Sequence, residues 1–242
     1  MASAVRAGSG AFVGRVGARP EHRLVLYEME ACPYSRKVRE QLCTLDLDVD
    51  IRPCPDGGSR HRRELRAIGG REEIPLLVDP NQDLALYGSD AIVRYLARTY
   101  GDGTVPWPLE LGPLTDMTSK LASLLRMRAG SEAELSRRPT LPLEMWGFEP
   151  CPDCRLVREV LCAYQIGYVL HNAARGSAKR LELRERMGAV KLPALFDSNT
   201  GASVTGRQPI VDYLRSMYGA RRIPDGQPVF VAEIARAHSM AA

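Results

Sequence analysis

One stretch occurs twice in the chain, first as Cys32-Pro33-Tyr34-Ser35-Arg36-Lys37-Val38-Arg39-Glu40-Gln41-Leu42-Cys43. It returns 119 residues later, counted from Cys32 to Cys151, as Cys151-Pro152-Asp153-Cys154-Arg155-Leu156-Val157-Arg158-Glu159-Val160-Leu161-Cys162. Three more pairs follow in the same order at an offset of 118: Ile74-Pro75 with Leu192-Pro193, Ile92–Leu96 with Ile210–Leu214, and Tyr100-Gly101 with Tyr218-Gly219. Matches that keep register over this length indicate an internal duplication.

Each copy predicts the same order of elements around this stretch, β-α-β-α-β-β-α. A short apolar run before each Cys-Pro predicts a strand, and the apolar residues after it fall at helical spacing. Turn-forming residues then lead to a hairpin, and an amphipathic helix ends each copy at Tyr100 or Tyr218. The predicted strands are Leu24–Tyr27, Val49–Ile51, Leu76–Val78, Leu143–Phe148, Tyr168–Leu170 and Ala194–Phe196, and the predicted middle helices are Ser59–Ile68 and Ser177–Met187.

These motifs together resemble two related families. A Cys-Pro-x-Cys or Cys-Pro-x-Ser opens a helix after a strand, an Ile-Pro or Leu-Pro precedes a hairpin, and Gly88-Ser89-Asp90-Ala91-Ile92 begins the last helix of the first copy. This combination resembles glutaredoxins and, equally, the N-terminal thioredoxin-fold domain of glutathione transferases. The tandem arrangement resembles a group of plant and algal proteins of plastid type. The resemblance implies an α/β fold of two thioredoxin-like domains, at residues 23–101 and 142–219.

Three further segments complete the expected organisation. Residues 1–22 form a flexible or transit-like arm, because they are rich in Ala, Ser, Gly and Arg and have no acid before Glu21. This composition is typical of an organelle transit peptide, and the resemblance implies a chloroplast location, with a mitochondrion or the cytoplasm as alternatives. Residues 102–141 form a linker with one predicted helix, Thr115–Ala129, and residues 220–242 form a tail in which Val229–Met240 predicts a short helix.

Composition excludes several classes of protein. The net charge of the 242 residues is +4, and residues 1–23 carry +3 of it, so the remainder does not predict nucleic-acid binding. No apolar run approaches the ~18 residues that a transmembrane helix needs. Six cysteines are too few for a secreted disulfide scaffold and indicate a reducing compartment.

Two cysteines are candidate nucleophiles because each stands where a strand meets a helix. Unpaired N–H groups and the helix dipole stabilise a thiolate at that position, so Cys32 and Cys151 are expected to react. Cys154 lies one turn further on and is placed to resolve a mixed disulfide formed on Cys151. Ser35 holds that position in the first copy, which leaves a monothiol site. The alternatives for Cys151 and Cys154 are an ancestral relic or half of a zinc site; no second Cys/His pair follows, so no metal site is expected.

The other cysteines have simpler expected roles. Cys43 and Cys162 fall on the apolar side of their helices and are expected in the core. Cys54 is expected to be an ordinary loop cysteine, with a secondary resolving thiol for Cys32 as the alternative.

The resemblance also implies a glutathione-binding surface. In both families the residue before the proline offers its backbone to the cysteine of glutathione, and the proline is cis; here these are Ile74-Pro75 and Leu192-Pro193. Ser89 and Asp90 match the segment that holds the γ-glutamyl end. The second copy has Arg207 and Gln208 there instead, so it lacks this clamp, although Arg207 can still meet a carboxylate.

Acidic residues depart from the glutaredoxin pattern, which commonly has a lysine before the cysteine. Glu28 and Glu30 precede Cys32, Glu149 precedes Cys151, and Asp153 lies inside the second motif. A nearby carboxylate opposes thiolate formation and repels anionic glutathione, so a poorer glutathione reductant is expected.

The leading hypothesis is a thiol–disulfide oxidoreductase that acts on glutathione or protein disulfides, with glutathione as co-substrate and no tightly bound cofactor. One alternative is a non-catalytic glutathione- or protein-binding module that retains the fold. Another is a glutathione-ligated iron–sulfur carrier using Cys32, against which Pro33 argues. A complete glutathione transferase is not expected, because the linker and tail are too short to build the helical domain that supplies its substrate pocket.

Overall fold

Two thioredoxin-like units share one continuous β-sheet in the computed structural model, which describes residues 10–106, 109, 130–222 and 228–230. The strand order is β4-β3-β1-β2-β6-β5-β7-β8. The first half comprises β1 (Leu24–Glu28), α1 (Pro33–Thr44), β2 (Val49–Pro53), α2 (Arg60–Gly69), β3 (Leu76–Asp79), β4 (Leu84–Tyr87) and α3 (Ser89–Tyr100). The second comprises β5 (Leu143–Gly147), α6 (Pro152–Ala163), β6 (Tyr168–Asn172), α7 (Lys179–Met187), β7 (Ala194–Asp197), β8 (Ala202–Thr205) and α8 (Arg207–Tyr218). The predicted β-α-β-α-β-β-α order is confirmed in both halves.

The two halves meet where β2 pairs with β6. The pairing is antiparallel, and Asp50 faces Val169, its own equivalent in the second copy. Val49 faces Leu170 and Ile51 faces Tyr168 on either side of that pair. A strand that pairs with its own duplicate in this way makes the halves related by an approximate two-fold axis.

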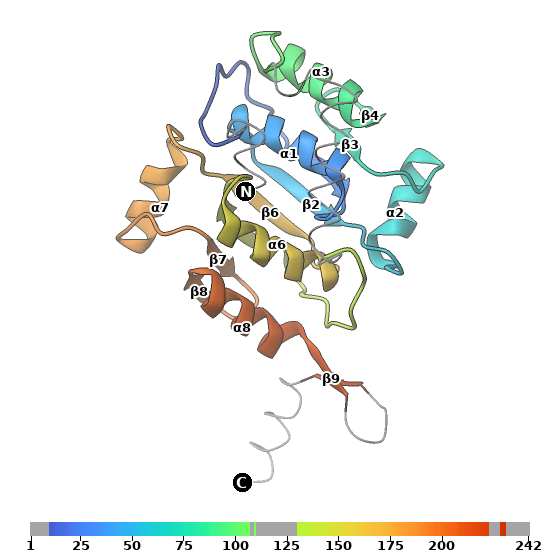
Figure 1. Cartoon of the computed structure of the whole chain (residues 1–242), viewed down its shortest axis with the longest axis vertical. Helices are drawn as coiled ribbons and strands as arrows, with labels where there is room; N and C mark the ends of the chain where they lie inside the picture. The colour runs from blue at the N-terminus through green and yellow to red at the C-terminus, as the bar shows by residue number, and fades with distance from the viewer. Residues whose placement is uncertain (1–9, 107–108, 110–129, 223–227, 231–242) are drawn as a thin grey trace.

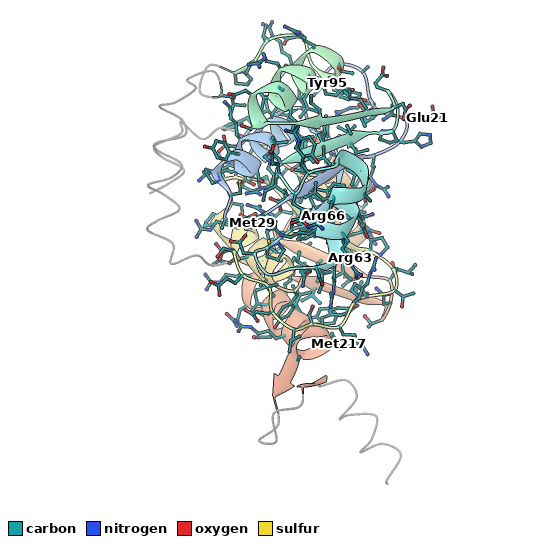
Figure 2. The ribbon with its side chains drawn as sticks, turned by 90° about the vertical axis from the view of Figure 1, so that its right-hand side faces the viewer. Glu21, Met29, Arg63, Arg66, Tyr95 and Met217 are labelled. Atoms are coloured by element: carbon teal, nitrogen blue, oxygen red, sulfur yellow. The ribbon has the colours of Figure 1, made fainter. Side chains whose placement is uncertain are left out.

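The helices follow the same symmetry. Figure 1 shows α1 and α6 near the middle of the molecule, with α3 and α8 farther out and α2 and α7 on opposite flanks. The molecule is elongated, with Tyr95 of α3 at one end and Met217 of α8 at the other (Figure 2). One hydrophobic cluster contains residues of both halves, among them the fully buried Leu26, Leu42, Met145 and Leu161. The halves therefore share a core as well as a sheet.

A buried aspartate anchors the last helix of each half to the hairpin before it. In the first half the Asp79 carboxylate accepts hydrogen bonds from the hydroxyls of Tyr95 (2.6 Å) and Tyr100 (2.5 Å). In the second half Asp197 accepts from Tyr213 (2.6 Å) and Tyr218. These bonds hold the pKa of both aspartates below its usual value despite burial. They orient α3 and α8, whose first residues belong to the candidate sites.

Residues 10–22, expected as part of a flexible or transit-like arm, make regular contacts with both halves. Phe12 forms a bridge with Arg175 of the second half, and Val16 forms one with Gly101 of the first. The N–H of Gly17 donates to the Tyr100 carbonyl at 2.8 Å. Residues 12–17 thus belong to the folded structure.

The end of the linker repeats this arrangement. Glu132 forms a bridge with Asp56 of the first half, and Ser136 forms one with Gly219 of the second. The predicted linker helix Thr115–Ala129 lies outside the described residues. Of the predicted tail helix only residues 229 and 230 are described; they belong to β10 (Pro228–Phe230), which pairs with β9 (Ala220–Arg222).

A buried ion-pair network joins α1 to α6. Arg39 of α1 contacts Glu149 of the second half, with 2.9 Å between Nε and Oε2. Arg158 of α6 contacts Glu30 of the first half at the same 2.9 Å. Arg39 also pairs with Glu28. The side chains of all five residues are at most 4% exposed, so each arginine holds a carboxylate of the opposite half in a site that is largely closed to solvent.

The network shifts the pKa values of two of its glutamates in opposite directions, so the two residues contribute differently to the pH dependence of stability. Burial, opposed by Arg39, raises the pKa of Glu28 to about 7, so the folded protein keeps a proton that the unfolded chain has already lost. The stability from Glu28 is therefore complete below its unfolded pKa and is lost as the pH rises through 7. The unfolding free energy of the wild-type protein should therefore fall between about pH 5 and about pH 8. In Glu28→Gln we expect this fall to be smaller by roughly 2 kcal/mol, as measured by urea denaturation.

Glu149→Gln is the contrasting variant. Arg158 and Arg39 lower the pKa of Glu149 to about 2 against its burial, so this carboxylate is charged throughout that pH range. Its loss leaves two buried arginines short of a partner and should destabilise the protein by about 3 kcal/mol at both pH values. Equal pH dependence in wild type and Glu28→Gln would contradict the role given to Glu28.

Candidate functional site

The two candidate nucleophiles occupy equivalent positions. Cys32 caps α1 and Cys151 caps α6, and the first residue of each helix is a proline, which suits a first turn. The thiols lie at the ends of β1 and β5, and their residues are 8% and 9% exposed. Both stand where free helical N–H groups stabilise negative charge, and both are largely shielded from solvent.

The proline segments lie beside these helix starts. Tyr27 near the end of β1 faces Leu76, the residue after Pro75, and Trp146 near the end of β5 faces Ala194, the residue after Pro193. The Ile74-Pro75 and Leu192-Pro193 peptide bonds are both cis, as the resemblance implied. The sheet register therefore brings each proline segment to the same end of the half as its cysteine.

Cys151 has a stabilised thiolate. Hydrogen bonding from the Cys154 side chain is the main cause, and it lowers the pKa of Cys151 to about 7 against the effect of burial. The backbone N–H of Cys154 also donates to Cys151 Sγ at 3.3 Å. The positive charge of Arg158 acts in the same direction. Cys151 is thus a thiol that ionises near neutral pH.

Cys154 has the opposite character. It is fully buried, and burial raises the pKa of its thiol well above the usual value. Its sulfur lies against Gly147, where a Cβ atom would be only 3.0 Å from Cys154 Sγ. The glycine therefore makes room for the second sulfur. A protonated thiol one turn below a thiolate is the arrangement that a dithiol site needs.

The first half differs at both of these positions. Glu28 stands where the second half has Gly147, and Ser35 stands where it has Cys154. Ser35 is fully buried, and its Oγ accepts a hydrogen bond from the Met29 N–H at 3.4 Å. A serine cannot form a disulfide, so Cys32 has no partner thiol within its own motif.

The segment expected to hold the γ-glutamyl end lies at the start of α3. Gly88 caps this helix with a φ of 84°, and Ser89 and Asp90 are its first two residues. Asp90 pairs with Lys37 of α1, whose side chain is 3% exposed while that of Asp90 is 54% exposed. The pair links α3 to the helix that begins at Cys32, and Asp90 remains accessible.

The equivalent segment of the second half is arranged differently. Arg207 is the first residue of α8, and its guanidinium lies 3.5 Å from the Asp153 carboxylate. Both side chains are about half exposed. Arg207 therefore already has a carboxylate partner within the chain, and the acid inside the Cys-Pro-Asp-Cys motif has its own cation.

The acidic residues near Cys151 do not prevent a lowered thiol pKa. Glu149 is paired with arginines, and the pKa of Cys151 is lowered. Glu28 and Glu30 are likewise buried and paired, so they do not face solvent where an anionic peptide would approach. The sequence could not show that each acid has an arginine partner, nor that Glu30 and Glu149 find theirs in the opposite half.

The remaining cysteines are buried as well. Cys43 and Cys162 lie in the core, as expected. Cys54 follows β2 and packs in a separate cluster with Tyr27, Leu65 and Leu76, and burial raises the pKa of its thiol to about 12. Among the described residues, no three His, Cys, Asp or Glu side chains form a group that could hold a metal ion. None of the described helices is long and apolar enough to span a membrane.

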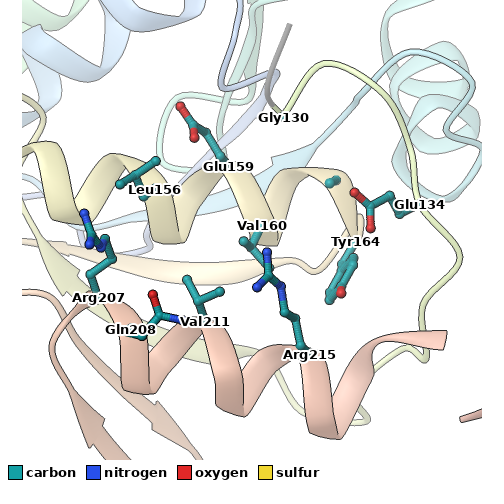
Figure 3. A pocket seen from close by; sticks show the side chains of 11 residues that line it. Gly130, Glu134, Leu156, Glu159, Val160, Tyr164, Arg207, Gln208, Val211 and Arg215 are labelled. Carbon is teal, nitrogen blue, oxygen red and sulfur yellow. The ribbon is translucent and has the colours of Figure 1, made fainter. Parts of the chain in front are cut away.

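A cavity of about 410 Å³ lies between α6 and α8, next to the second site (Figure 3). Side chains of α8 point toward α6 across an apolar floor, and acidic side chains stand opposite. Neither Cys32 nor Cys151 lines it. The lining residues include Arg207, Gln208 and Arg215 on one wall, Leu156, Val160 and Val211 on the floor, and Glu134 and Glu159 opposite.

Sequence reasoning missed three residues that shape the sites, namely Gly147, Arg39 and Arg158. The signal for the arginines was available, since both occur at the 119-residue offset on the inner side of their helices. The signal for Gly147 was a difference between the two copies. Gly147 is equivalent to Glu28, and Cys154, in the same half as Gly147, is equivalent to Ser35.

Comparisons with known proteins identify one family. The model described as "Glutathione S-transferase, N-terminal domain" matches the chain twice, over residues 26–104 and 145–222. Among solved structures, a glutathione transferase of Bombyx mori is similar at 26% identity and a TM-score of 0.32, and the match spans 35% of this chain and 38% of that one. A trimeric glutathione transferase of Leishmania matches at 12% identity and a TM-score of 0.30, over 85% of this chain and 70% of that one. No curated protein matches the chain.

The hydrogen bonds around Cys151 predict its reactivity. We expect iodoacetamide to modify Cys151 with a pH midpoint near 7 and to leave Cys154 unmodified in the folded protein, as measured by peptide mass spectrometry. Cys154→Ala removes the side-chain donor and should raise the midpoint by about one unit or more, whereas Cys154→Ser keeps a donor and should raise it less. An unchanged midpoint in Cys154→Ala would exclude Cys154 as the cause.

Proposed function

Because the chain belongs to the glutathione S-transferase N-terminal domain family, with one such domain in each half, we propose that it is a glutathione-linked thiol–disulfide oxidoreductase. Cys151 and Cys154 form its dithiol site, and Cys32 forms a separate monothiol site. The observation that carries this proposal is the pairing in α6 of a thiol whose pKa is about 7 with a buried thiol one turn away. A family likeness alone does not assign this chemistry.

The dithiol reaction follows from that arrangement. The Cys151 thiolate attacks one sulfur of a disulfide, forms a mixed disulfide and releases the other sulfur as a thiolate, which takes up a proton from water. Cys154 then loses its proton and attacks Cys151 Sγ, which releases the second substrate thiolate and leaves a Cys151–Cys154 disulfide. Two electrons pass to the substrate. Two molecules of glutathione return the site to the dithiol and become glutathione disulfide.

Glutathione is the proposed partner of the first half. Ser89 and Asp90 lie at a helix start, where N–H groups favour a carboxylate. Asp90 is about half exposed, so its carboxylate can meet a ligand ammonium group in addition to that of Lys37. The register of β1, β3 and β4 places this helix start near the Ile74-Pro75 segment and the end of the strand that leads to Cys32. Cys32 attack on glutathione disulfide yields a Cys32–glutathione adduct and one glutathione thiolate. The second half lacks this clamp and is proposed to exchange with protein disulfides.

A binding module without catalysis is the second candidate. The low exposure of both nucleophiles favours it, since a thiol that is 8% or 9% exposed requires local opening before it reaches a protein disulfide. Absence of any mixed disulfide, together with calorimetric glutathione binding, would support this candidate. Absence of both would contradict a glutathione-linked function.

Single cysteine variants separate the two sites. We expect glutathione disulfide to modify Cys32, so Cys32→Ser should abolish the adduct seen by mass spectrometry. Cys151→Ser should abolish reduction of a protein disulfide such as that of insulin and leave the Cys32 adduct unchanged. Cys54→Ser is the control, because that thiol is buried and has a raised pKa. An adduct retained in Cys32→Ser would refute the monothiol assignment.

The clamp can be tested without redox chemistry. Ser89→Ala and Asp90→Asn should each weaken glutathione binding by about 1–3 kcal/mol, because each leaves a polar group of the peptide without its partner. Titration calorimetry with a Cys32→Ser background excludes covalent capture. Asp212→Asn on the exposed side of α8 serves as a control, and an equal effect there would argue against a specific clamp.

A further inference from the structure

The loop that carries each candidate nucleophile is attached to the helix of the opposite half. Glu30 lies two residues before Cys32, and its backbone N–H donates to the sulfur of Cys162 on α6 at 3.5 Å. Its carboxylate meets Arg158 of the same helix through two contacts, Nε to Oε2 at 2.9 Å and Nη2 to Oε1 at 3.1 Å. The loop before Cys32 is therefore fastened at its backbone and its side chain to the helix that begins at Cys151.

The reverse attachment is present as well. Glu149 lies two residues before Cys151, and its carboxylate meets Arg39 of α1 at 2.9 Å. Its backbone hydrogen-bonds the sulfur of Cys43 on the same helix. Cys43 and Cys162 thus do more than fill the core, since each sulfur contacts the loop of the other half.

Arg158 connects this attachment to the chemistry of the second site. It lies two turns after Cys151 on α6, and its side chain is 1% exposed. Its charge is shared between Glu30 and Glu149, and its Nη1 atom is buried without a hydrogen-bond partner among the described residues. Because this site is shielded from solvent, the charges of the arginine and the two carboxylates are poorly screened. Their electric field therefore acts on the nearby thiols.

We propose that Glu30, a residue of the first half, is a positioning residue for Cys151 in the second half and acts through Arg158. Glu30 holds the guanidinium and neutralises part of its charge, which limits the stabilisation that Arg158 gives to the Cys151 thiolate. A change in the Cys32 loop that draws Glu30 away from Arg158 makes Cys151 more acidic. The two thiol sites are in this way coupled across the two-fold axis. The proposal extends the proposed function, because its purpose is to link the two sites of one oxidoreductase.

Other charged and titratable groups face Arg158 and Cys151, and they define the controls. The most important is Glu28, which is buried in the same network but pairs with Arg39. These groups are Glu28, Glu30, Arg39 and Cys43 from the first half, and Glu149, Asp153, Cys154 and Tyr168 from the second.

The test measures the ionisation of Cys151 in the full chain. Iodoacetamide, a neutral probe, is applied across a range of pH, and the modification of Cys151 is followed by peptide mass spectrometry. In Glu30→Gln we expect the rate at about pH 6 to rise roughly threefold, which corresponds to a midpoint about half a unit lower. Arg158→Gln should shift the midpoint upward. Glu28→Gln, in the same network, changes a residue that keeps its proton at this pH; it removes no charge and should shift the midpoint less than Glu30→Gln.

A double variant distinguishes coupling from general disruption. If Glu30 acts through Arg158, adding Glu30→Gln to Arg158→Gln should produce no further shift of the Cys151 midpoint. An additive shift, or a wild-type midpoint in folded Glu30→Gln, would overturn the proposal. If Glu30→Gln does not fold, Glu30→Asp keeps the charge but withdraws it from Arg158, and it should give a smaller shift in the same direction; no shift would again overturn the proposal.

This readout is independent of the proposed function. Alkylation by iodoacetamide requires neither a disulfide substrate nor glutathione. A protein that fails to reduce insulin and forms no glutathione adduct would refute the proposed function, and the midpoint shift in Glu30→Gln would still be observed. If the enzyme is active and the alkylation midpoint of Cys151 is the same in Glu30→Gln as in the wild type, only the coupling is refuted.

Discussion

The structure depends on an exchange of ion pairs between the two halves, in which α1 and α6 each bind a glutamate of the opposite half. Arg39 and Arg158 each hold a glutamate of the opposite half, and no part of the exchange is open to solvent. Removing two opposite charges from water costs about as much as their attraction returns, so such pairs add little net stability. Breaking one pair is costly, because it leaves a buried charge alone. The exchange therefore specifies how the halves are placed more than it stabilises them.

The paired strands and the ion pairs support one another. The register in which Asp50 faces Val169 places the starts of α1 and α6 on either side of the two-fold axis, and only then do Glu30 and Glu149 reach the opposite helix. Residues 12–17 and 132–136 add bridges to both halves. Tandem domains joined only by a linker would be expected to move relative to each other. Here the shared sheet, core and charges favour one rigid unit.

The duplication has left two sites with different chemistry. In the second half Gly147 and Cys154 occur together, and in the first half Glu28 and Ser35 replace both. The helix that follows also differs, since Ser89 and Asp90 correspond to Arg207 and Gln208. Lys37 pairs with Asp90 in one half, whereas Asp153 pairs with Arg207 in the other. Each half keeps a thiol at a helix start and has changed the groups around it.

The sequence by itself determined the duplication, the order of elements and the positions of Cys32 and Cys151 at helix starts. These features follow from local rules, namely the period of apolar residues, turn chemistry and the free N–H groups of a first helical turn. The tertiary structure alone decided that β2 pairs with β6, that Glu30 and Glu149 are neutralised by arginines, and that Asp153 meets Arg207. The physical reason is that these contacts join residues of different elements, most of them more than a hundred positions apart in the sequence. A local sequence pattern does not indicate which charged side chains will be buried next to each other.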